Sequence, residues 1–505
     1  MSETTPLSEQ VTDDHHSALS RKLNTFGNLA ITYSGVGAAA GIFSLFGFSL
    51  GFSGATMVWG WVIVGLLWGV MSLLFAELSS HYPYAGAVYQ WSSILGGRKV
   101  GWWVGWIYLF GILFVLTGVY FVLPVAVVPL LGLAGSQGQI VAIAIICLLV
   151  AAACNAAGIT VLGRLNRYGV VLELGVFTAV TLLVVIFAPH HQPLSVVTNT
   201  LGTSHGAGGW MRNFLGGGIF VSVWVLGLFE NGGTLGEETI DAQRKAPKAV
   251  LGAWAVTFVT GLAFILAILT AIPDLGDINT TGTPVQDVIS AAANDTGGKL
   301  YLVLITCITL LACTAIFAGA VRHVFSMARD GMLPGSNFLS RTSPRTAAPI
   351  GAIVVIAAST ALPLVASRTI AVLVTGAVAV LYVAYFLITS VLLVARVKGW
   401  PSRSAPFSLG RCGLPLNAVA VVFTAAMMVN LMWPRQATNP HKAGLPVAWW
   451  LLGAPLIVGI GYYLAGVAPK LRRALRAAAT PHAEQRIAVE VAASAGVTDR
   501  VLHSR

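Results

Sequence analysis

Residues 31–43 decide the fold, and they read Ile31-Thr32-Tyr33-Ser34-Gly35-Val36-Gly37-Ala38-Ala39-Ala40-Gly41-Ile42-Phe43. They fall in the middle of an apolar run over 26–50, where an ordinary membrane-spanning helix carries Leu and Val. A second run, over 211–236, contains Trp224-Val225-Leu226-Gly227-Leu228-Phe229-Glu230-Asn231-Gly232-Gly233-Thr234-Leu235-Gly236. Glycine accepts backbone conformations outside the helical region and lets a ligand approach the backbone. We therefore expect both helices to be interrupted at mid-membrane.

The composition around these two stretches is that of a membrane protein. The chain has 505 residues, of which 56% are hydrophobic and 9% are charged, and its mean hydropathy is +0.81. A soluble domain carries about 25% charged residues, and a disordered chain needs low hydrophobicity with high charge. Both classes are excluded. The net charge of +11 does not indicate a nucleic-acid partner, because the basic residues lie in small groups between apolar runs.

Twelve apolar runs have the length of about 20 residues that a spanning helix needs. Lipid offers no hydrogen bonds to free backbone groups, so these runs must be helices. We predict an all-α polytopic membrane protein with about 12 transmembrane helices, at 26–50, 56–80, 102–130, 138–158, 166–188, 211–236, 249–272, 299–328, 348–366, 369–395, 413–433 and 446–467.

The basic residues predict the orientation of these helices. Cytoplasmic loops carry an excess of Lys and Arg. With a cytoplasmic N-terminus, 24 of the 29 Lys and Arg fall on the inner side, and five fall outside: Arg212, Lys299, Arg368, Arg435 and Lys442. We expect both termini in the cytoplasm, with an N-terminal segment over 1–23, a transporter domain over 24–467 and a basic tail over 468–505. Long, turn-rich loops are expected outside, at 189–210 and 273–298.

The two interrupted helices enter the membrane from opposite sides, the first from inside and the sixth from outside. Opposite topology at corresponding positions predicts an inverted repeat of five helices plus five. Repeat one is expected over about 24–188 and repeat two over about 211–396, and two peripheral helices follow over about 413–467.

A broken helix can build a binding site, because unwinding frees backbone N–H and C=O groups and a half-helix N-terminus carries positive partial charge. The alternative is that the glycines only allow close helix packing. The matched pair of stretches favours a site, and the predicted substrate-binding residues are Ser34, Gly35, Val36, Gly37, Ala39, Ala40, Gly41, Trp224, Phe229, Glu230, Asn231 and Gly232.

Three acidic residues fall well within the predicted spans. A charge at mid-membrane costs about 2.5–3.5 kcal/mol on insertion scales, so such residues are candidates for function. Glu230 is the best candidate proton carrier, and the alternative, which is compatible with that role, is a carboxylate that caps the second half-helix. Glu173 is a second candidate proton site, against the alternative of a snorkelling or internally paired acid. Glu77 is expected to be structural and to pair with a loop residue.

Charged residues in two inner loops predict a cytoplasmic gate. Arg329-Asp330 would meet Glu237 or Glu238 when this face is closed, and the alternative is a solvated loop. The five cysteines have no metal-ligand spacing and are expected to be reduced and structural. We expect no metal and no cofactor. The chain also lacks H-E-x-x-H, G-x-S-x-G and G-x-x-x-x-G-K-[ST], which argues against an enzyme and against ATP hydrolysis.

Several further motifs carry a resemblance to a family. They are Met57-Val58-Trp59-Gly60-Trp61, Ala76-Glu77-Leu78-Ser79-Ser80 with Tyr82-Pro83, Glu237-Glu238-Thr239 followed by Ala246-Pro247-Lys248-Ala249, and Ala328-Arg329-Asp330-Gly331-Met332-Leu333-Pro334. Together they resemble the amino acid–polyamine–organocation superfamily, and most closely its branch of amino acid, choline and γ-aminobutyrate permeases. The resemblance covers roughly residues 24–465.

The resemblance implies a substrate site between broken helices one and six, lined also by helices three, eight and ten. In related arginine–agmatine antiporters a G-[small]-G-[VI]-F stretch takes the substrate carboxylate, and Ala39, Ala40 and Gly41 stand at the matching positions. A tryptophan six residues before an acid serves there as a gate and a proton-sensitive group, which matches Trp224 and Glu230. The closer branch has Tyr-Asp where this chain has Phe229-Glu230, so the acid is one methylene longer.

The sequence therefore predicts a secondary transporter of amino acids or related amines in the cytoplasmic membrane. Protons are the expected coupling ion. Sodium is the alternative, because Thr306, Thr309 and Thr314 offer hydroxyls on helix eight. Exchange-type antiport and a substrate-sensing receptor remain open on the same fold, and the oligomeric state is not predicted.

Overall fold

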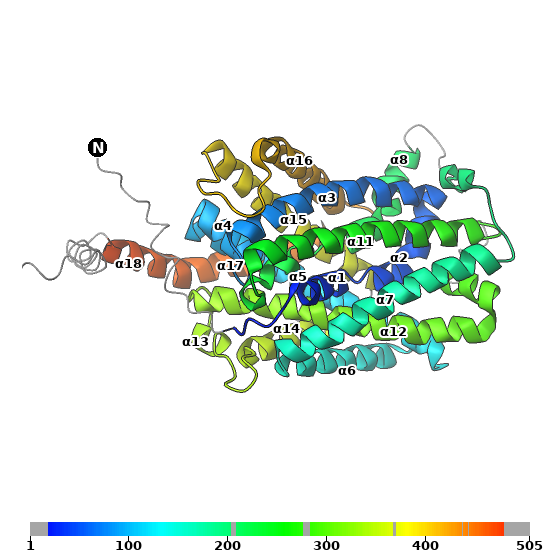
Figure 1. Cartoon of the computed structure of the whole chain (residues 1–505), viewed down its shortest axis with the longest axis horizontal. Helices are drawn as coiled ribbons and strands as arrows, with labels where there is room; N and C mark the ends of the chain where they lie inside the picture. The colour runs from blue at the N-terminus through cyan, green and yellow to red at the C-terminus, as the bar shows by residue number, and fades with distance from the viewer. Residues whose placement is uncertain are drawn as a thin grey trace, which may run out of the picture. The chain divides into compact units, whose positions relative to one another are not determined.

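The computed structural model describes residues 19–203, 209–275, 283–366, 370–436, 438–442 and 444–478. Within these residues the chain is almost entirely helical (Figure 1). The first half contains α1 (Thr25–Val36), α2 (Ala38–Ser53), α3 (Met57–His81), α4 (Ala87–Gly96), α5 (Arg98–Leu130), α6 (Gln137–Ala156) and α7 (Ile159–Phe187).

The second half has more and shorter pieces. Its helices are α8 (Gly209–Asn213), α9 (Phe220–Val225), α10 (Asn231–Thr234), α11 (Ala242–Ala271), α12 (Pro284–Arg329), α13 (Ser336–Leu339), α14 (Ile350–Ala366), α15 (Ile370–Val397), α16 (Gly413–Met432), α17 (Val447–Tyr462) and α18 (Ala468–Ala478). One antiparallel pair of short strands, β1 (His441–Lys442) and β2 (Leu445–Pro446), precedes α17. Short 3-10 or π turns complete the described part: η1 (Gly54–Thr56), η2 (Leu194–Thr198), η3 (Phe214–Gly218), η4 (Gly236–Glu238), η6 (Gly410–Cys412) and η7 (Tyr463–Val467).

The predicted membrane class is confirmed. Nine helical stretches of the described chain are long and apolar enough to cross a membrane, and the first of them, Thr25–His81, contains α1, α2 and α3 together. Each of the twelve predicted spans contains helix in the described residues, and the first and sixth are interrupted. The chain is an all-α, multi-pass membrane protein.

One boundary differs from the sequence-based expectation. The outer loop expected over 273–298 is partly helical, because α12 begins at Pro284, and proline favours the first turn of a helix. The helix bends at Asn294, whose φ is 68°. At the other end, α18 accounts for the first part of the predicted tail, while 1–18 and 479–505 lie outside the described residues.

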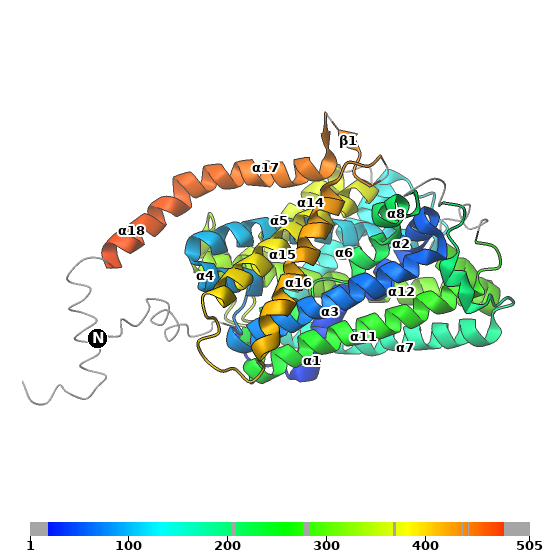
Figure 2. The same ribbon diagram turned by 90° about the horizontal axis from the view of Figure 1, so that it is seen from above.

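Residues up to Leu452 form one compact unit, and the chain from Gly453 onward forms a second. In the first unit α11 packs between α3 and α7, and α12 follows α7 (Figure 1). On the opposite side α15 lies between α5 and α16 (Figure 2).

Large aromatic side chains fill the interior of this unit, among them Trp61, Trp68, Trp91, Trp102, Tyr120 and Tyr385. Aromatic rings bury a large area each and contribute strongly to packing. The described part of the second unit contains the end of α17, the π turn η7 and α18.

Glu77 has the structural contacts that the sequence predicted, and its partners include residues of a loop. Its carboxylate forms an ion pair with Arg396 in the last turn of α15. It also accepts hydrogen bonds from the Ser408 hydroxyl (3.2 Å) and from the Leu409 amide (2.9 Å) in the loop that follows. The pair joins the C-terminal end of α3 to that of α15.

Candidate functional site

Both predicted interruptions are present. In the first segment α1 ends at Val36 and α2 begins at Ala38, with Gly37 between them in the left-handed region (φ 62°). Only glycine adopts this conformation without cost. In the sixth segment α9 ends at Val225 and α10 begins at Asn231, and Leu226–Glu230 are not helical. The predicted site residues all belong to the breaks or to the helical turns that flank them.

The two breaks lie side by side. A Cβ added to Gly35 would lie 3.0 Å from Nδ2 of Asn231, so α1 and α10 touch at this point. Beyond the break, in α2, a Cβ on Gly41 would overlap the side chain of Val225 and come within 3.2 Å of Trp224 Cδ1. The space beside Gly41 is therefore filled by α9. Gly41 serves close helix packing in this conformation.

Polar atoms that the protein itself leaves unpaired gather at the breaks. The hydroxyl of Ser34, the side-chain amide of Asn231 and Oε2 of Glu230 are buried and have no hydrogen-bond partner among the described residues. Buried polar atoms are nearly always paired, so each exception needs an explanation. A bound polar ligand would supply the missing partners.

Glu230 is held from two directions by tyrosines. Its Oε1 accepts a hydrogen bond from the Tyr108 hydroxyl of α5 (2.8 Å) and another from the Tyr385 hydroxyl of α15 (2.7 Å). The Tyr385 hydroxyl in turn accepts a hydrogen bond from the amide of Leu228 (3.3 Å). The acid is thus oriented on one oxygen and open on the other.

An aromatic wall adjoins this acid. A small cavity of about 20 Å³, enough for roughly one water molecule, is lined by Trp68, Val115, Val223, Trp224, Gly227, Leu228, Val378, Leu381, Tyr382 and Tyr385. Phe229 packs edge-on against Trp68 with 5.7 Å between ring centres, and the indole nitrogen of Trp68 donates to the Tyr382 hydroxyl (2.9 Å). The predicted Trp224 and Phe229 therefore belong to one aromatic cluster.

Glu173 occupies the N-terminus of α2. Its Oε1 accepts a hydrogen bond from the backbone N–H of Ala39 at 3.1 Å. The N–H of Gly41 is bonded to the carbonyl of Gly37 (3.0 Å). Two of the three amides predicted to meet a substrate carboxylate are therefore already engaged within the chain, and Glu173 lies at the first break.

The predicted cytoplasmic gate residues meet as two separate groups. Arg329 binds both carboxylate oxygens of Glu237, at 2.8 and 2.9 Å. Asp330 instead accepts hydrogen bonds from Tyr89 (2.8 Å) and Gln90 (3.1 Å) of α4. Burial, followed by the charge and hydrogen bond of Asp330, raises the pKa of Tyr89, which keeps this phenol a proton donor.

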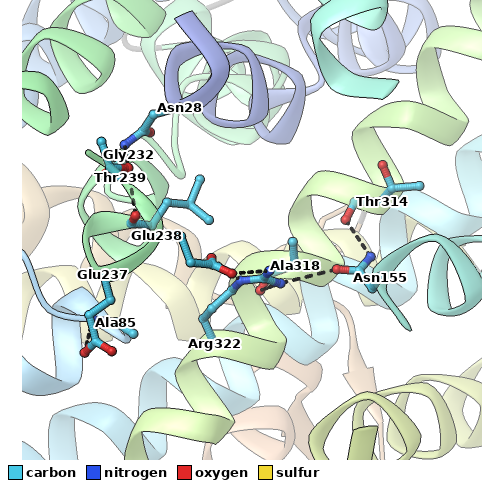
Figure 3. A network of polar contacts seen from close by, with 11 residues as sticks. Asn28, Ala85, Asn155, Gly232, Glu237, Glu238, Thr239, Thr314, Ala318 and Arg322 are labelled. Carbon is cyan, nitrogen blue, oxygen red and sulfur yellow. Dashed lines mark hydrogen bonds and ion pairs between the residues drawn. The ribbon is translucent and has the colours of Figure 1, made fainter. Parts of the chain in front are cut away.

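Glu238 pairs with Arg322, which lies within the predicted span over 299–328. Arg322 of α12 reaches both oxygens of Glu238 at 2.9 and 3.0 Å, and it also contacts Asn155 of α6 (Figure 3). On the other side of the same turn, the Asn28 amide donates to the carbonyl of Gly232 and to the Thr239 hydroxyl, both at 2.9 Å. Hydrogen bonds thus join α1 to α10, and the ion pair joins the following turn η4 to α12.

Sequence reasoning missed the residues that approach the breaks from other helices. These are Trp68, Tyr108, Arg322, Tyr382 and Tyr385. Arg322 carried a usable signal, since it lies inside an apolar run where an unpaired charge is costly. The aromatic residues carried none, because aromatics are common throughout the chain.

Comparison with known proteins agrees with the earlier resemblance. Residues 23–461 match the family model described as "Amino acid permease". The chain is 26% identical to amino-acid permease BAT1 of Arabidopsis thaliana, over 82% of this chain and 86% of that protein. It is 28% identical to the BAT1 homolog of Oryza sativa subsp. japonica, over 82% and 85%, and 24% identical to a choline transporter of Saccharomyces cerevisiae, over 75% and 69%.

Proposed function

The chain belongs to the amino acid permease family, and from that premise we propose that it is a proton-coupled carrier working by alternating access in the cytoplasmic membrane. Family membership makes it a multi-pass transporter of amino acids or amines rather than an enzyme. The proposal adds the site, the coupling ion and the orientation, with both termini in the cytoplasm. It also takes the two broken helices as parts of an inverted repeat, over about 24–188 and 211–396.

The observation that carries this proposal is Glu230, a fully buried acid with one oxygen unpartnered beside a helix break. Such an oxygen is suited to bind an ammonium group or a proton, because either one neutralises the charge that burial disfavours. Ser34 and Asn231 add unpaired polar atoms across the break. Gly35, Val36 and Gly37 bring backbone groups to the same place, and Ala39–Gly41 and Gly232 begin the two half-helices.

Coupling follows from competition at this acid. A substrate that binds differently to the protonated and deprotonated forms of Glu230 transfers that preference to the proton gradient. Glu173 is the second candidate for proton binding. The ion pair of Glu237 with Arg329 forms the cytoplasmic gate in this proposal. The neighbouring residues Glu238 and Asp330 stabilise it through their own contacts with Arg322 and Tyr89.

The face that α12 turns toward the first break favours protons over sodium. A Cβ on Gly37 would lie 3.3 Å from the Cβ of Ala312, and one on Gly35 would lie 3.7 Å from that of Ala315. Alanine offers no oxygen from its side chain, whereas a sodium ion requires oxygen ligands. The hydroxyls of Thr306, Thr309 and Thr314 each donate to a carbonyl of their own helix.

The test is uptake by the purified full-length chain in proteoliposomes, with the membrane potential clamped. An inwardly directed proton gradient should drive accumulation of a labelled amine or amino acid, and an inward sodium gradient should not. Glu230→Gln should flatten the dependence on external pH while retaining exchange, and Glu230→Asp, which keeps the carboxylate, should retain the dependence. Sodium-driven uptake that ignores a protonophore would refute proton coupling.

A further inference from the structure

The charge balance of the buried glutamates separates them into two groups. Among the described residues five glutamates are buried, and three of them pair with arginine: Glu77 with Arg396, Glu237 with Arg329 and Glu238 with Arg322. The other two, Glu173 and Glu230, form no ion pair with any described residue. Because an uncompensated buried charge is strongly unfavourable, these two acids call for a cation or a proton from outside the chain.

The two unpaired acids border the same place. Glu173 contacts the first turn of α2, and Glu230 directly precedes α10. The breaks themselves are adjacent, since Gly35 approaches Asn231 and Gly41 approaches Val225. The turns that hold the two carboxyl groups therefore border one place, and the structure puts no arginine or lysine side chain against either acid in the part that it describes.

The position that would receive a substrate carboxylate is already taken. A half-helix N-terminus attracts anions through its free amides and its dipole. In this chain the Glu173 side chain accepts from the Ala39 amide, and it does so through a carboxyl oxygen whether the group is ionised or protonated. An incoming carboxylate would have to displace Glu173 or lie beside a second acid.

The remaining wall suits an organic cation. Trp68, Trp224, Tyr382 and Tyr385 line the cavity next to Glu230, and Phe229 packs onto Trp68. Aromatic faces attract ammonium and quaternary ammonium groups through their negative electrostatic potential. Tyr108 and Tyr385 donate hydrogen bonds to Oε1 of Glu230, which leaves Oε2 free to pair with the ammonium group of a substrate.

We propose that this transporter selects cationic amines that lack a carboxylate, and that Glu173 is the specificity-determining residue that excludes carboxylate-bearing substrates from the α2 N-terminus. The inference rests on the proposed function and narrows it. The two acids then have separate roles, because Glu230 attracts the ammonium group of a substrate and Glu173 excludes a substrate carboxylate.

Matched pairs of compounds that differ by one carboxylate test the proposal. The purified full-length chain would be titrated with agmatine and arginine, cadaverine and lysine, tyramine and tyrosine, and choline and glycine betaine, and binding would be read from the ligand-dependent rise in melting temperature. In every pair that shifts the melting temperature, the carboxylate-free member should bind at least about tenfold tighter. A substrate carboxylate must displace the Glu173 carboxyl from the Ala39 amide or, where Glu173 is ionised, meet a like charge that costs several kcal/mol, and tenfold corresponds to about 1.4 kcal/mol. Equal or tighter binding of the carboxylate-bearing members would overturn the proposal. If no compound shifts the melting temperature, the proposed function fails as well.

Two variants of Glu173 then identify the residue responsible. Glu173→Gln keeps a carbonyl oxygen for the Ala39 amide and removes the charge, whereas Glu173→Ala removes both. The ratio of the affinity for the amine to the affinity for the matching amino acid should fall in Glu173→Gln and fall further in Glu173→Ala. Glu230→Gln is the contrasting variant and should weaken both members of a pair, leaving their ratio unchanged. An unchanged ratio in both Glu173 variants, with melting temperatures showing that they fold, would overturn the role of Glu173.

Discussion

Arg322 and Glu238 form a buried, two-point ion pair, with nitrogen–oxygen distances of 2.9 and 3.0 Å. Seven residues further along α12, which is about two helical turns, Arg329 grips the neighbouring Glu237 in the same way. The two pairs differ in exposure. The side chains of the first are each 4% exposed, whereas that of Arg329 is 18% exposed. The more buried pair, Arg322–Glu238, is therefore suited to stabilising the fold. The more exposed pair, Arg329–Glu237, is suited to breaking when a gate opens.

We predict unequal costs of removing the two arginines. Arg322→Ala should lower the free energy of unfolding by about 3–5 kcal/mol, because it leaves Glu238 buried without a counter-charge. Arg329→Ala should cost less, since Arg329 is itself 18% exposed and water can enter the space that its side chain leaves beside Glu237. Thermal unfolding in detergent measures both. The double variant Arg322→Met/Glu238→Leu should recover much of the loss, and equal losses in the two single variants would contradict the distinction.

The Arg329 pair should control access from the cytoplasmic side. Arg329→Ala removes both hydrogen bonds to Glu237 and should shift the population toward an inward-open state. A cysteine introduced at the break, Ser34→Cys, should then react faster with a membrane-impermeant maleimide added from the inner side. Arg345→Ala, in the loop beyond α13, is the matched control. Equal labelling rates in the two variants would remove the gate role.

Bulk at Gly41 should abolish substrate binding in a folded protein. Gly41→Leu forces Val225 and Trp224 away from α2, which separates the outer halves of the two broken helices. Gly175→Leu is the control, because a Cβ at Gly175 of α7 meets open space. Both variants should unfold cooperatively, and only Gly41→Leu should lose ligand-dependent stabilisation. Wild-type affinity in Gly41→Leu would show that the first break is not part of the site.

Trp224→Ala should weaken binding more than removal of an interfacial tryptophan. Trp224 lines the cavity next to the second break, whereas Trp433 is 60% exposed after the end of α16. An aromatic face against an ammonium group is worth about 0.5–2 kcal/mol, so the loss should be about 2- to 30-fold in affinity. Comparable small effects of Trp224→Ala and Trp433→Ala on binding would assign Trp224 to packing alone.

The tyrosines around Glu230 should set the pH at which uptake responds. Tyr385→Phe removes one of the two donors to Oε1, which stabilises the charged carboxylate less. The midpoint of the uptake–pH profile should therefore move to higher pH, by about one unit for a hydrogen bond worth about 1.5 kcal/mol. Tyr382→Phe is the control, because its hydroxyl accepts from Trp68 and does not contact Glu230. A profile displaced equally in both variants, or in neither, would contradict this.

The sequence predicted the parts of the site that are local and missed those that are not. Gly37 and the stretch from Leu226 to Glu230 carry their breaks in their own composition, since glycine and a buried acid do not suit an uninterrupted apolar helix. The contact of Tyr385 with Glu230 joins residues 155 positions apart, and the sequence of neither segment predicts it. The same holds for Glu173, whose partner is a backbone amide. Because every residue except proline carries a backbone N–H, the residue type at position 39 does not predict this contact.

Leu228 is the one residue of the second break that adopts a left-handed conformation (φ 61°) without being glycine. Such a conformation costs an ordinary residue about 1–2 kcal/mol, and here the Leu228 amide is held by the Tyr385 hydroxyl that also binds Glu230. The left-handed backbone of Leu228 and the buried carboxylate of Glu230 therefore share one tyrosine hydroxyl. A change in the hydrogen bonding of Glu230 is thus expected to reach the main chain between α9 and α10 directly.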